Sequence, residues 1–319
     1  MSTNTKNYPH SFKSILCCFA LLLVINTHSS TLYPAKLSIL STGGALANAI
    51  FFFCSGYSLF HGSRKTGFIK WMVKRILRLY PSMWLFLFLS NLCLNTDYSW
   101  IDFIDTPFWF VNTIFIFYFG YYIIIHYIPT KIPLVIMALS IPYLGIYFFF
   151  NNHSSFLIDW TENPTCLHWF YYFAIMMLGA YFAPQNMLNI HHIYQKTLVT
   201  SILYFGFKSY IRHMESLYIY QFLIPVGLFP LVTQLFFIAK QMASRLKEKI
   251  LLCRSIEYIS TLSLDAYIIQ FTIIELFAST HIPFRFPLAI ITILIMAGGM
   301  HTIASIFSKW AVKVLQINT

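Results

Sequence analysis

Long apolar segments, each close to the length that crosses a bilayer, follow one another along almost the whole chain. A membrane-spanning α-helix needs about 20 predominantly apolar residues. Segments of this kind occupy residues 12–31, 39–61, 80–96, 107–128, 132–150, 166–183, 196–211, 215–239, 256–279 and 284–308. A transmembrane β-barrel would show short alternating segments instead, and the sequence lacks them. The pattern therefore predicts an all-α, polytopic integral membrane protein with about ten transmembrane helices.

Composition agrees with this class, because 58% of the residues are hydrophobic and only 10% are charged, against roughly 25% charged in soluble domains. We expect a single transmembrane domain over residues 1–319, with no appended soluble domain. Lys6 and Lys13 precede the apolar run 15–25, as in a signal peptide. No clear small-residue cleavage site follows this run, so we expect a retained first helix.

The net charge of +11 is explained by membrane topology. With a cytoplasmic N-terminus, 17 of the 21 Lys and Arg residues fall in cytoplasmic segments, and only Lys36, Lys208, Arg212 and Arg285 fall outside. Cytoplasmic loops of membrane proteins carry this excess. Both termini are therefore predicted to be cytoplasmic, with membrane lipids as partners of the basic residues, and no nucleic acid is needed to explain the charge.

The segment from residue 64 to residue 80 carries the largest group of basic side chains. Its apolar residues fall on one helical stripe, and Lys70, Lys74, Arg75 and Arg78 fall opposite. This pattern is typical of an amphipathic helix on the inner membrane face. Two interpretations remain: anchoring to anionic lipid, or a phosphate-binding site, because Arg75 and Arg78 share a helix face and guanidinium groups fit phosphate oxygens.

Polar side chains inside apolar segments are candidates for chemistry, because they are costly in a membrane unless they are paired or line a watery cavity. His28, near the outer end of the first segment, is a candidate base. The Ser55-Gly56 pair either lets helices approach closely or opens a path for substrate. Trp109 and Phe110 either belong to an interfacial aromatic belt or stack on a sugar.

A late apolar segment holds several polar residues of this kind. Ser263, Tyr267 and Gln270 share one helix face. Asp265 either is neutralised by a cation from another helix or takes part in function, and the same alternatives apply to His301 in the last segment.

Two sequence elements together resemble the membrane acyltransferase-3 family, whose members O-acylate bacterial polysaccharides and related glycans. The first is an FFxxSG element (Phe52, Phe53, Ser55, Gly56), and the second is a KRxxRxxP element (Lys74, Arg75, Arg78, Pro81). Their order, spacing and setting between the second and third segments carry the resemblance. Weaker matches are Trp109-Phe110, Met177-Leu178-Gly179, and Ser263 to Tyr267, which is similar to the family's SxxxY element.

Two positions depart from the family pattern. The family usually has an Arg about ten residues before the first-helix His, whereas Cys17 stands eleven residues before His28. The family often has a His three residues after the late-helix Tyr, whereas Gln270, which cannot carry a proton, stands here. This second departure leaves a catalytically silent homologue as an alternative.

The resemblance implies an enzyme of the bacterial inner membrane that moves an acyl group from acetyl-CoA to a hydroxyl of a polysaccharide, O-antigen, capsule or lipid-linked sugar. A thioester is already activated, so this chemistry needs positioning, a base and oxyanion donors, and no metal. We assign catalysis to His28, Ser55, Asp265 and Tyr267, binding of acetyl-CoA to Lys74, Arg75 and Arg78, and binding of the acceptor to Trp109, Phe110 and Gln270.

Two other functions fit parts of the pattern. A transporter or flippase of lipid-linked sugars would use intramembrane acids and His as a proton relay, but transporters commonly show repeated halves and broken helices, and we find neither. A sugar polymerase or glycosyltransferase would favour large polar outer loops, whereas the expected outer loops are short.

Overall fold

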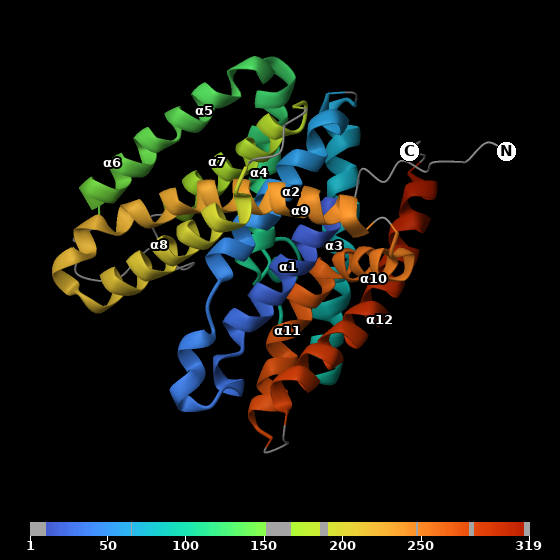
Figure 1. Cartoon of the computed structure of the whole chain (residues 1–319). Helices are drawn as coiled ribbons and strands as arrows, with labels where there is room; N and C mark the ends of the chain where they lie inside the picture. Colours follow the sequence, from blue (N-terminus) through green and yellow to red (C-terminus); the bar gives the residue numbers. More distant parts are fainter. Residues whose placement is uncertain are drawn as a thin grey trace.

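The computed structural model describes residues 11–64, 66–150, 167–185, 191–246, 248–280 and 284–315. Within these ranges every regular element is a helix, which confirms the predicted all-α class there (Figure 1). The first half contains α1 (Ser11–His28), α2 (Gly44–Ser63), α3 (Phe68–Cys93), α4 (Trp109–Tyr127), α5 (Ile132–Ala138), α6 (Ser140–Phe150) and α7 (Leu167–Phe182). The second half contains α8 (Ile193–His213), α9 (Leu228–Leu246), α10 (Ile250–Thr261), α11 (Ser263–Ala278) and α12 (Arg285–Val314). The short 3-10 segments are η1 (Ser30–Leu32), η2 (Ala35–Leu40), η3 (Trp100–Phe103), η4 (Pro129–Lys131) and η5 (Glu215–Gly227).

Six helical stretches of the described chain are long and apolar enough to cross a membrane. They are Ala35–Ser63, Phe68–Cys93, Trp109–Tyr127, Pro129–Phe149, Glu215–Leu246 and Arg285–Val314. The pair α10 and α11, bent by 66° at Leu262, makes a seventh if it is one span. Apolar helices α1 and α7 are shorter. The chain is therefore a multi-pass membrane protein by length and composition, while the predicted ten spans and the cytoplasmic termini remain predictions.

Helix α3 is continuous from Phe68 to Cys93, so the interpretation of residues 64–80 as a separate surface helix is wrong. Pro81 lies inside α3 and does not end it. A proline in a membrane helix removes one backbone hydrogen bond, and neighbouring groups compensate for that loss. The basic residues Lys70 to Arg78 therefore occupy the first half of a long helix whose second half is apolar.

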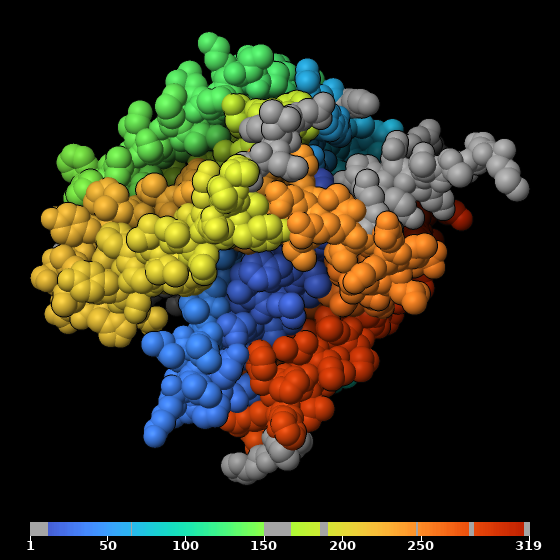
Figure 2. Space-filling view, in the orientation of Figure 1, coloured from blue at the N-terminus to red at the C-terminus, as the bar shows by residue number. Residues whose placement is uncertain are grey.

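Helix α1 lies at the centre of the arrangement. It packs against α2, α9, α10 and α11, and Figure 2 shows its surface between α8 and α9 on one side and α11 and α12 on the other. The two ends of α1 therefore contact different helices. Because α1 is central, it connects parts of the molecule that lie far apart.

Helices α2 and α7 form the closest helix pair because glycines face each other's backbone. A Cβ atom at Gly56 of α2 would overlap the carbonyl oxygen of Met176, and one at Gly179 of α7 would overlap the carbonyl oxygen of Phe53. Tyr121 of α4 donates a hydrogen bond to the carbonyl oxygen of Gly56 (2.6 Å) and fixes a third helix to this contact. The FFxxSG and Met177-Leu178-Gly179 elements are therefore two halves of one packing contact, as small residues allow between membrane helices.

We expect Gly56→Ala and Gly179→Ala each to destabilise the fold, because neither overlapping carbonyl can move without shifting a helix. The loss should lie at the upper end of the about 1–3 kcal/mol seen for overpacked cores. Gly206→Ala in α8 is the matched control, since its added methyl meets nothing within 4 Å and Ala favours a helix by about 1 kcal/mol. Thermal unfolding of purified protein in detergent measures all three, and equal melting temperatures would contradict the packing role.

Candidate acceptor cavity and cationic cluster

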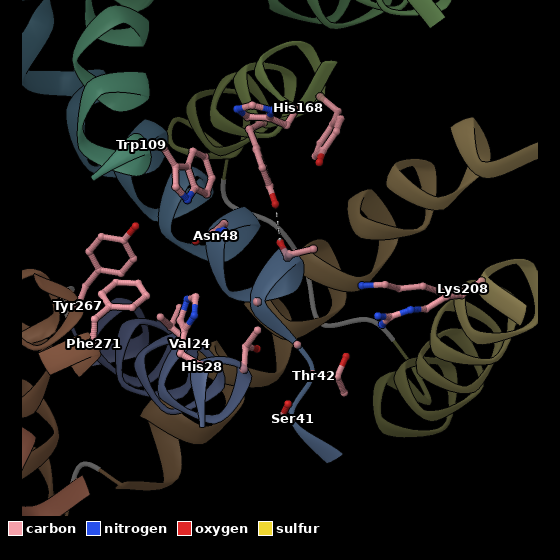
Figure 3. Close-up of a pocket in the computed structure, with 17 residues that line it drawn as sticks. Val24, His28, Ser41, Thr42, Asn48, Trp109, His168, Lys208, Tyr267 and Phe271 are labelled. Carbon is pink, nitrogen blue, oxygen red and sulfur yellow. Dashed lines mark hydrogen bonds between the residues drawn. The ribbon is translucent and has the colours of Figure 1, made fainter. Parts of the chain in front are cut away.

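A cavity of about 480 Å³ opens where the end of α1, the start of α2 and parts of α4, α7, α8 and α11 meet. Its volume lies in the range of small-molecule sites, about 300–1,000 Å³. His28, Trp109 and Tyr267, three residues assigned from the sequence, all line it. Figure 3 shows these side chains together with Phe271 and Asn48 around the same space.

The wall formed by α1 and α2 depends on Asn26 and on two glycines. Asn26 donates hydrogen bonds from Nδ2 to the carbonyl oxygens of Leu40 (2.8 Å) and Thr42 (3.0 Å). These bonds connect the end of α1 to the segment just before α2. Gly43 has a φ of 110°, which residues with a side chain rarely adopt. A Cβ at Gly44 would lie 3.0 Å from the Thr27 side chain. Larger residues at these glycines would push α2 away from α1.

His28 is the last residue of α1 and lies exposed at the cavity. Its ring packs edge-on against Phe271 of α11, with centroids 4.5 Å apart. The ring is therefore oriented by an aromatic neighbour while it remains open to a ligand. This placement fits the assignment of His28 as a base.

Aromatic rings form much of the remaining wall. Trp109 stacks on Tyr172 (6.2 Å, 28° between planes) and meets His168 edge-on (5.2 Å). Tyr267 packs against the ring of Phe110, with ring centroids 5.6 Å apart. Phe110 itself is buried behind Tyr267 and does not line the cavity, so it supports a lining residue.

His168 is a cavity residue that sequence reasoning missed. It is only 6% exposed, and its Nδ1 is buried with no hydrogen-bond partner in the described part of the chain. A polar residue next to Trp169 at the start of an apolar helix was the available signal. Buried polar atoms nearly always have partners, so an unpaired ring nitrogen in a cavity wall suggests contact with water or ligand.

Three other assigned residues do not line the cavity. Asp265 is 1% exposed and accepts a hydrogen bond from Nδ1 of His301 in α12 (2.9 Å). It lies two residues before Tyr267, and two helical positions are about 200° apart, so the two side chains face different neighbours. Gln270 is fully buried, with both amide atoms unpaired among the described residues, and Ser55 is half-buried on α2.

A group of cations lies far from the cavity along α1. Lys13 of α1 is within electrostatic range of Arg75 and Arg78 on α3. Arg75 is half-buried, with its guanidinium 5.6 Å from the centre of the Trp71 ring, whereas Arg78 is exposed and Lys74 is half-buried. Lys13 precedes His28 by 15 residues, which is about 22 Å along a helix. We call Lys13, Arg75 and Arg78 the cationic cluster.

Cys17 lies one turn after Lys13, at the place where the resembled family carries an Arg. Cys17 and Cys54 of α2 are both buried. The nearest preceding cation on α1 is Lys13.

Three of the four basic residues expected outside the cell lie at the end of the molecule that holds the cavity. Lys208 and Arg212 line the cavity, and Arg285 donates from Nε to the carbonyl oxygen of Leu32 (3.1 Å), just after α1. The cationic cluster lies toward the other end of α1. The basic residues expected outside the cell and the cationic cluster, expected in the cytoplasm, therefore lie toward different ends of α1.

Comparison with known proteins identifies the family of this chain. A family model described as an acyltransferase domain matches residues 16–309, nearly the whole chain. No curated protein and no solved structure matches the chain. The chain belongs to the acyltransferase-3 family, which confirms the resemblance, and it is a membrane acyltransferase that transfers groups other than aminoacyl groups.

Because buried Asp265 pairs with the partly exposed His301, we expect truncation of either to destabilise the protein through the group left behind. Asp265→Ala and His301→Ala should each lower the free energy of unfolding by about 2 kcal/mol, as for hydrogen bonds to charged groups. The double variant should be little less stable than the less stable single variant, because the two residues contact each other and their losses should not add. Glu275→Ala, at an exposed site on the same helix, is the control; strictly additive losses in a denaturation series would exclude the pairing.

Proposed function

We propose that this membrane acyltransferase moves an acetyl group from acetyl-CoA to a hydroxyl of a cell-surface polysaccharide, O-antigen, capsule or lipid-linked sugar. The proposal depends on one observation: the cationic cluster and the cavity lie near opposite ends of α1. The cationic cluster lies near the start of α1, and the cavity with His28 lies at its end. The bacterial inner membrane, with the cluster on the cytoplasmic side, is part of the same proposal.

The cationic cluster suits the phosphates of coenzyme A. Three positive charges close together repel one another unless an anion lies between them. Trp71 Nε1 and Arg75 Nε are both buried N–H donors with no partner in the described ranges. A phosphate supplies acceptor oxygens and negative charge together, and guanidinium groups bind it well. Lys74, on the same helix, would add a further positive charge.

The acceptor cavity suits a sugar hydroxyl. Trp109, Tyr171 and Tyr172 offer ring faces to a sugar, and His28 and Tyr267 offer polar atoms. Coenzyme A carries its thioester on a long flexible arm. Its phosphates can therefore bind near the start of α1 while the thioester extends toward His28.

The reaction needs one base and one hydrogen-bond donor. His28 accepts the proton of the acceptor hydroxyl, and the hydroxyl oxygen attacks the thioester carbonyl carbon. The hydroxyl of Tyr267, whose ring packs against Phe110, donates a hydrogen bond to the oxygen on which negative charge develops. The carbon–sulfur bond then breaks, and coenzyme A leaves as a thiol with the proton that His28 carried.

The proposal is tested by chemical analysis of the product. Membranes that contain the protein should transfer label from radiolabelled acetyl-CoA to glycan. NMR of the surface polysaccharide should show O-acetyl signals with the gene and lack them without it. Transport of unlabelled sugar without transfer would identify a flippase instead, and neither activity would identify a silent homologue.

Loss of a guanidinium from the cationic cluster should weaken acetyl-CoA binding. Arg75→Ala and Arg78→Ala should each weaken coenzyme A affinity by about tenfold or more, because each removes a charge-assisted hydrogen bond. Lys70→Ala is the matched control, since Lys70 is an exposed cation on the same helix. Calorimetry with coenzyme A measures the effect, and normal acetylation by both arginine variants would exclude the donor site.

His28→Ala should lose acetyl transfer while it keeps coenzyme A affinity, because the base acts far from the phosphates. A general base contributes about 10²–10⁴ in rate. His61→Ala removes an exposed histidine of α2 outside the cavity and should remain active. Wild-type turnover of the His28 variant would remove this residue from the mechanism.

A further inference from the structure

Two cations of α8 form one wall of the cavity. Lys208 and Arg212 both line it, and they are four residues apart, so they lie on one face of the helix. Figure 3 shows Lys208 on the far side of the cavity from His28, Tyr267 and Phe271. The aromatic wall and the cationic wall therefore face the same space from different helices.

No described lining residue carries a negative charge. The lining contains neither Asp nor Glu, and its histidines are His28 and His168. With both histidines neutral, the lining has two positive charges. A cleft lined by one sign of charge with apolar walls concentrates ligands of the opposite sign.

Groups other than the Arg212 guanidinium help to hold helix α8 in place. Helix α8 packs on η5 and α9. Gln234 of α9 donates a hydrogen bond from Nε2 to the Thr200 hydroxyl of α8 (3.0 Å). Tyr218 of η5 bonds the backbone carbonyl of Arg212 (3.3 Å), which fixes this end of the helix without using the guanidinium. The backbone is thus held by other groups while the charged ends reach the cavity.

We propose that the acceptor is an anionic sugar, and that Lys208 and Arg212 bind its carboxylate or phosphate while its hydroxyl faces His28. This inference rests on the proposed function, because it names the substrate class of that site. Guanidinium and ammonium groups bind both kinds of anion through charge-assisted hydrogen bonds. The carboxylate would belong to an acidic sugar of the glycan, and the phosphate to a lipid-linked sugar.

A direct binding experiment separates these sources. The full-length protein is reconstituted in nanodiscs of phosphatidylcholine, which has no net charge. Three probes are titrated by calorimetry: trigalacturonic acid, the neutral galactotriose, and a short-chain polyprenyl diphosphate N-acetylglucosamine. We expect one of the two anionic probes to bind at least tenfold more tightly than galactotriose, and more weakly as salt is raised.

Variants test whether the two cations are responsible. In Lys208→Gln and Arg212→Gln, affinity for the preferred anionic probe should fall about tenfold each, and affinity for galactotriose should stay within about twofold. Lys196→Gln, on α8 but outside the cavity lining, should change neither value. Lys208→Arg keeps the charge and should keep the preference, and circular dichroism and elution volume verify that each variant is folded.

The outcomes distinguish this inference from the proposed function. Equal binding of anionic and neutral probes, or an unchanged preference in both glutamine variants, overturns the anionic acceptor. Transfer of acetyl to galactotriose with unchanged rate in both variants overturns it as well, and leaves the acyl transfer intact. A charge-dependent preference without transfer to any probe supports the anionic site and counts against the proposed reaction. If the substitutions change only how well the protein is retained in phosphatidylglycerol nanodiscs, the two cations bind lipid and the inference is wrong.

Discussion

The direct backbone contact of α2 with α7 is the constraint on which the cavity depends. Gly56 and Gly179 bring the two helices together so closely that no side chain fits between them. This contact sets where the other end of α7 can lie, and there Tyr172 donates to the carbonyl oxygen of Ala45 (3.4 Å). Two walls of the cavity, from the starts of α2 and α7, are therefore positioned by small residues that touch no ligand.

The sequence predicted best what depends on local pattern. The helices, the FFxxSG and KRxxRxxP elements, and the polar residues His28, Trp109 and Tyr267 could all be found along the chain. These three residues come from α1, α4 and α11, and only the family resemblance suggested that they meet. Asp265 was grouped with Tyr267 because both lie on one helix, but their faces differ, and the partner His301 lies 36 residues away.

What the sequence could not predict comes from contacts between distant segments. Nothing near Lys13 in the sequence distinguishes it from a lysine that only sets the membrane topology. Its closeness to Arg75 and Arg78 depends on how the helices pack in the folded chain. His168 had a local signal, as a histidine beside Trp169 at the start of an apolar helix, but its place in the cavity wall depends on how α7 packs against distant segments. The amphipathic helix expected over residues 64–80 from its stripes of apolar and basic residues instead continues through Pro81 to Cys93, because in a membrane a proline inside a helix does not have to end it.

Buried polar atoms in this apolar chain fall into two kinds. Asp265 Oδ2 with His301, and Tyr121 with the carbonyl oxygen of Gly56, form hydrogen bonds that join helices. The other kind has no partner among the described residues, and it comprises Trp71 Nε1, Arg75 Nε, His168 Nδ1, Gln234 Oε1, Asp265 Oδ1 and both amide atoms of Gln270. An unpaired buried donor costs about 1–3 kcal/mol, so such atoms persist where something else completes them. Trp71 and Arg75 lie at the cationic cluster and His168 lies in the cavity wall, which are the two places where the proposed reaction needs a donor and an acceptor to bind, whereas Gln234, Asp265 and Gln270 lie outside both.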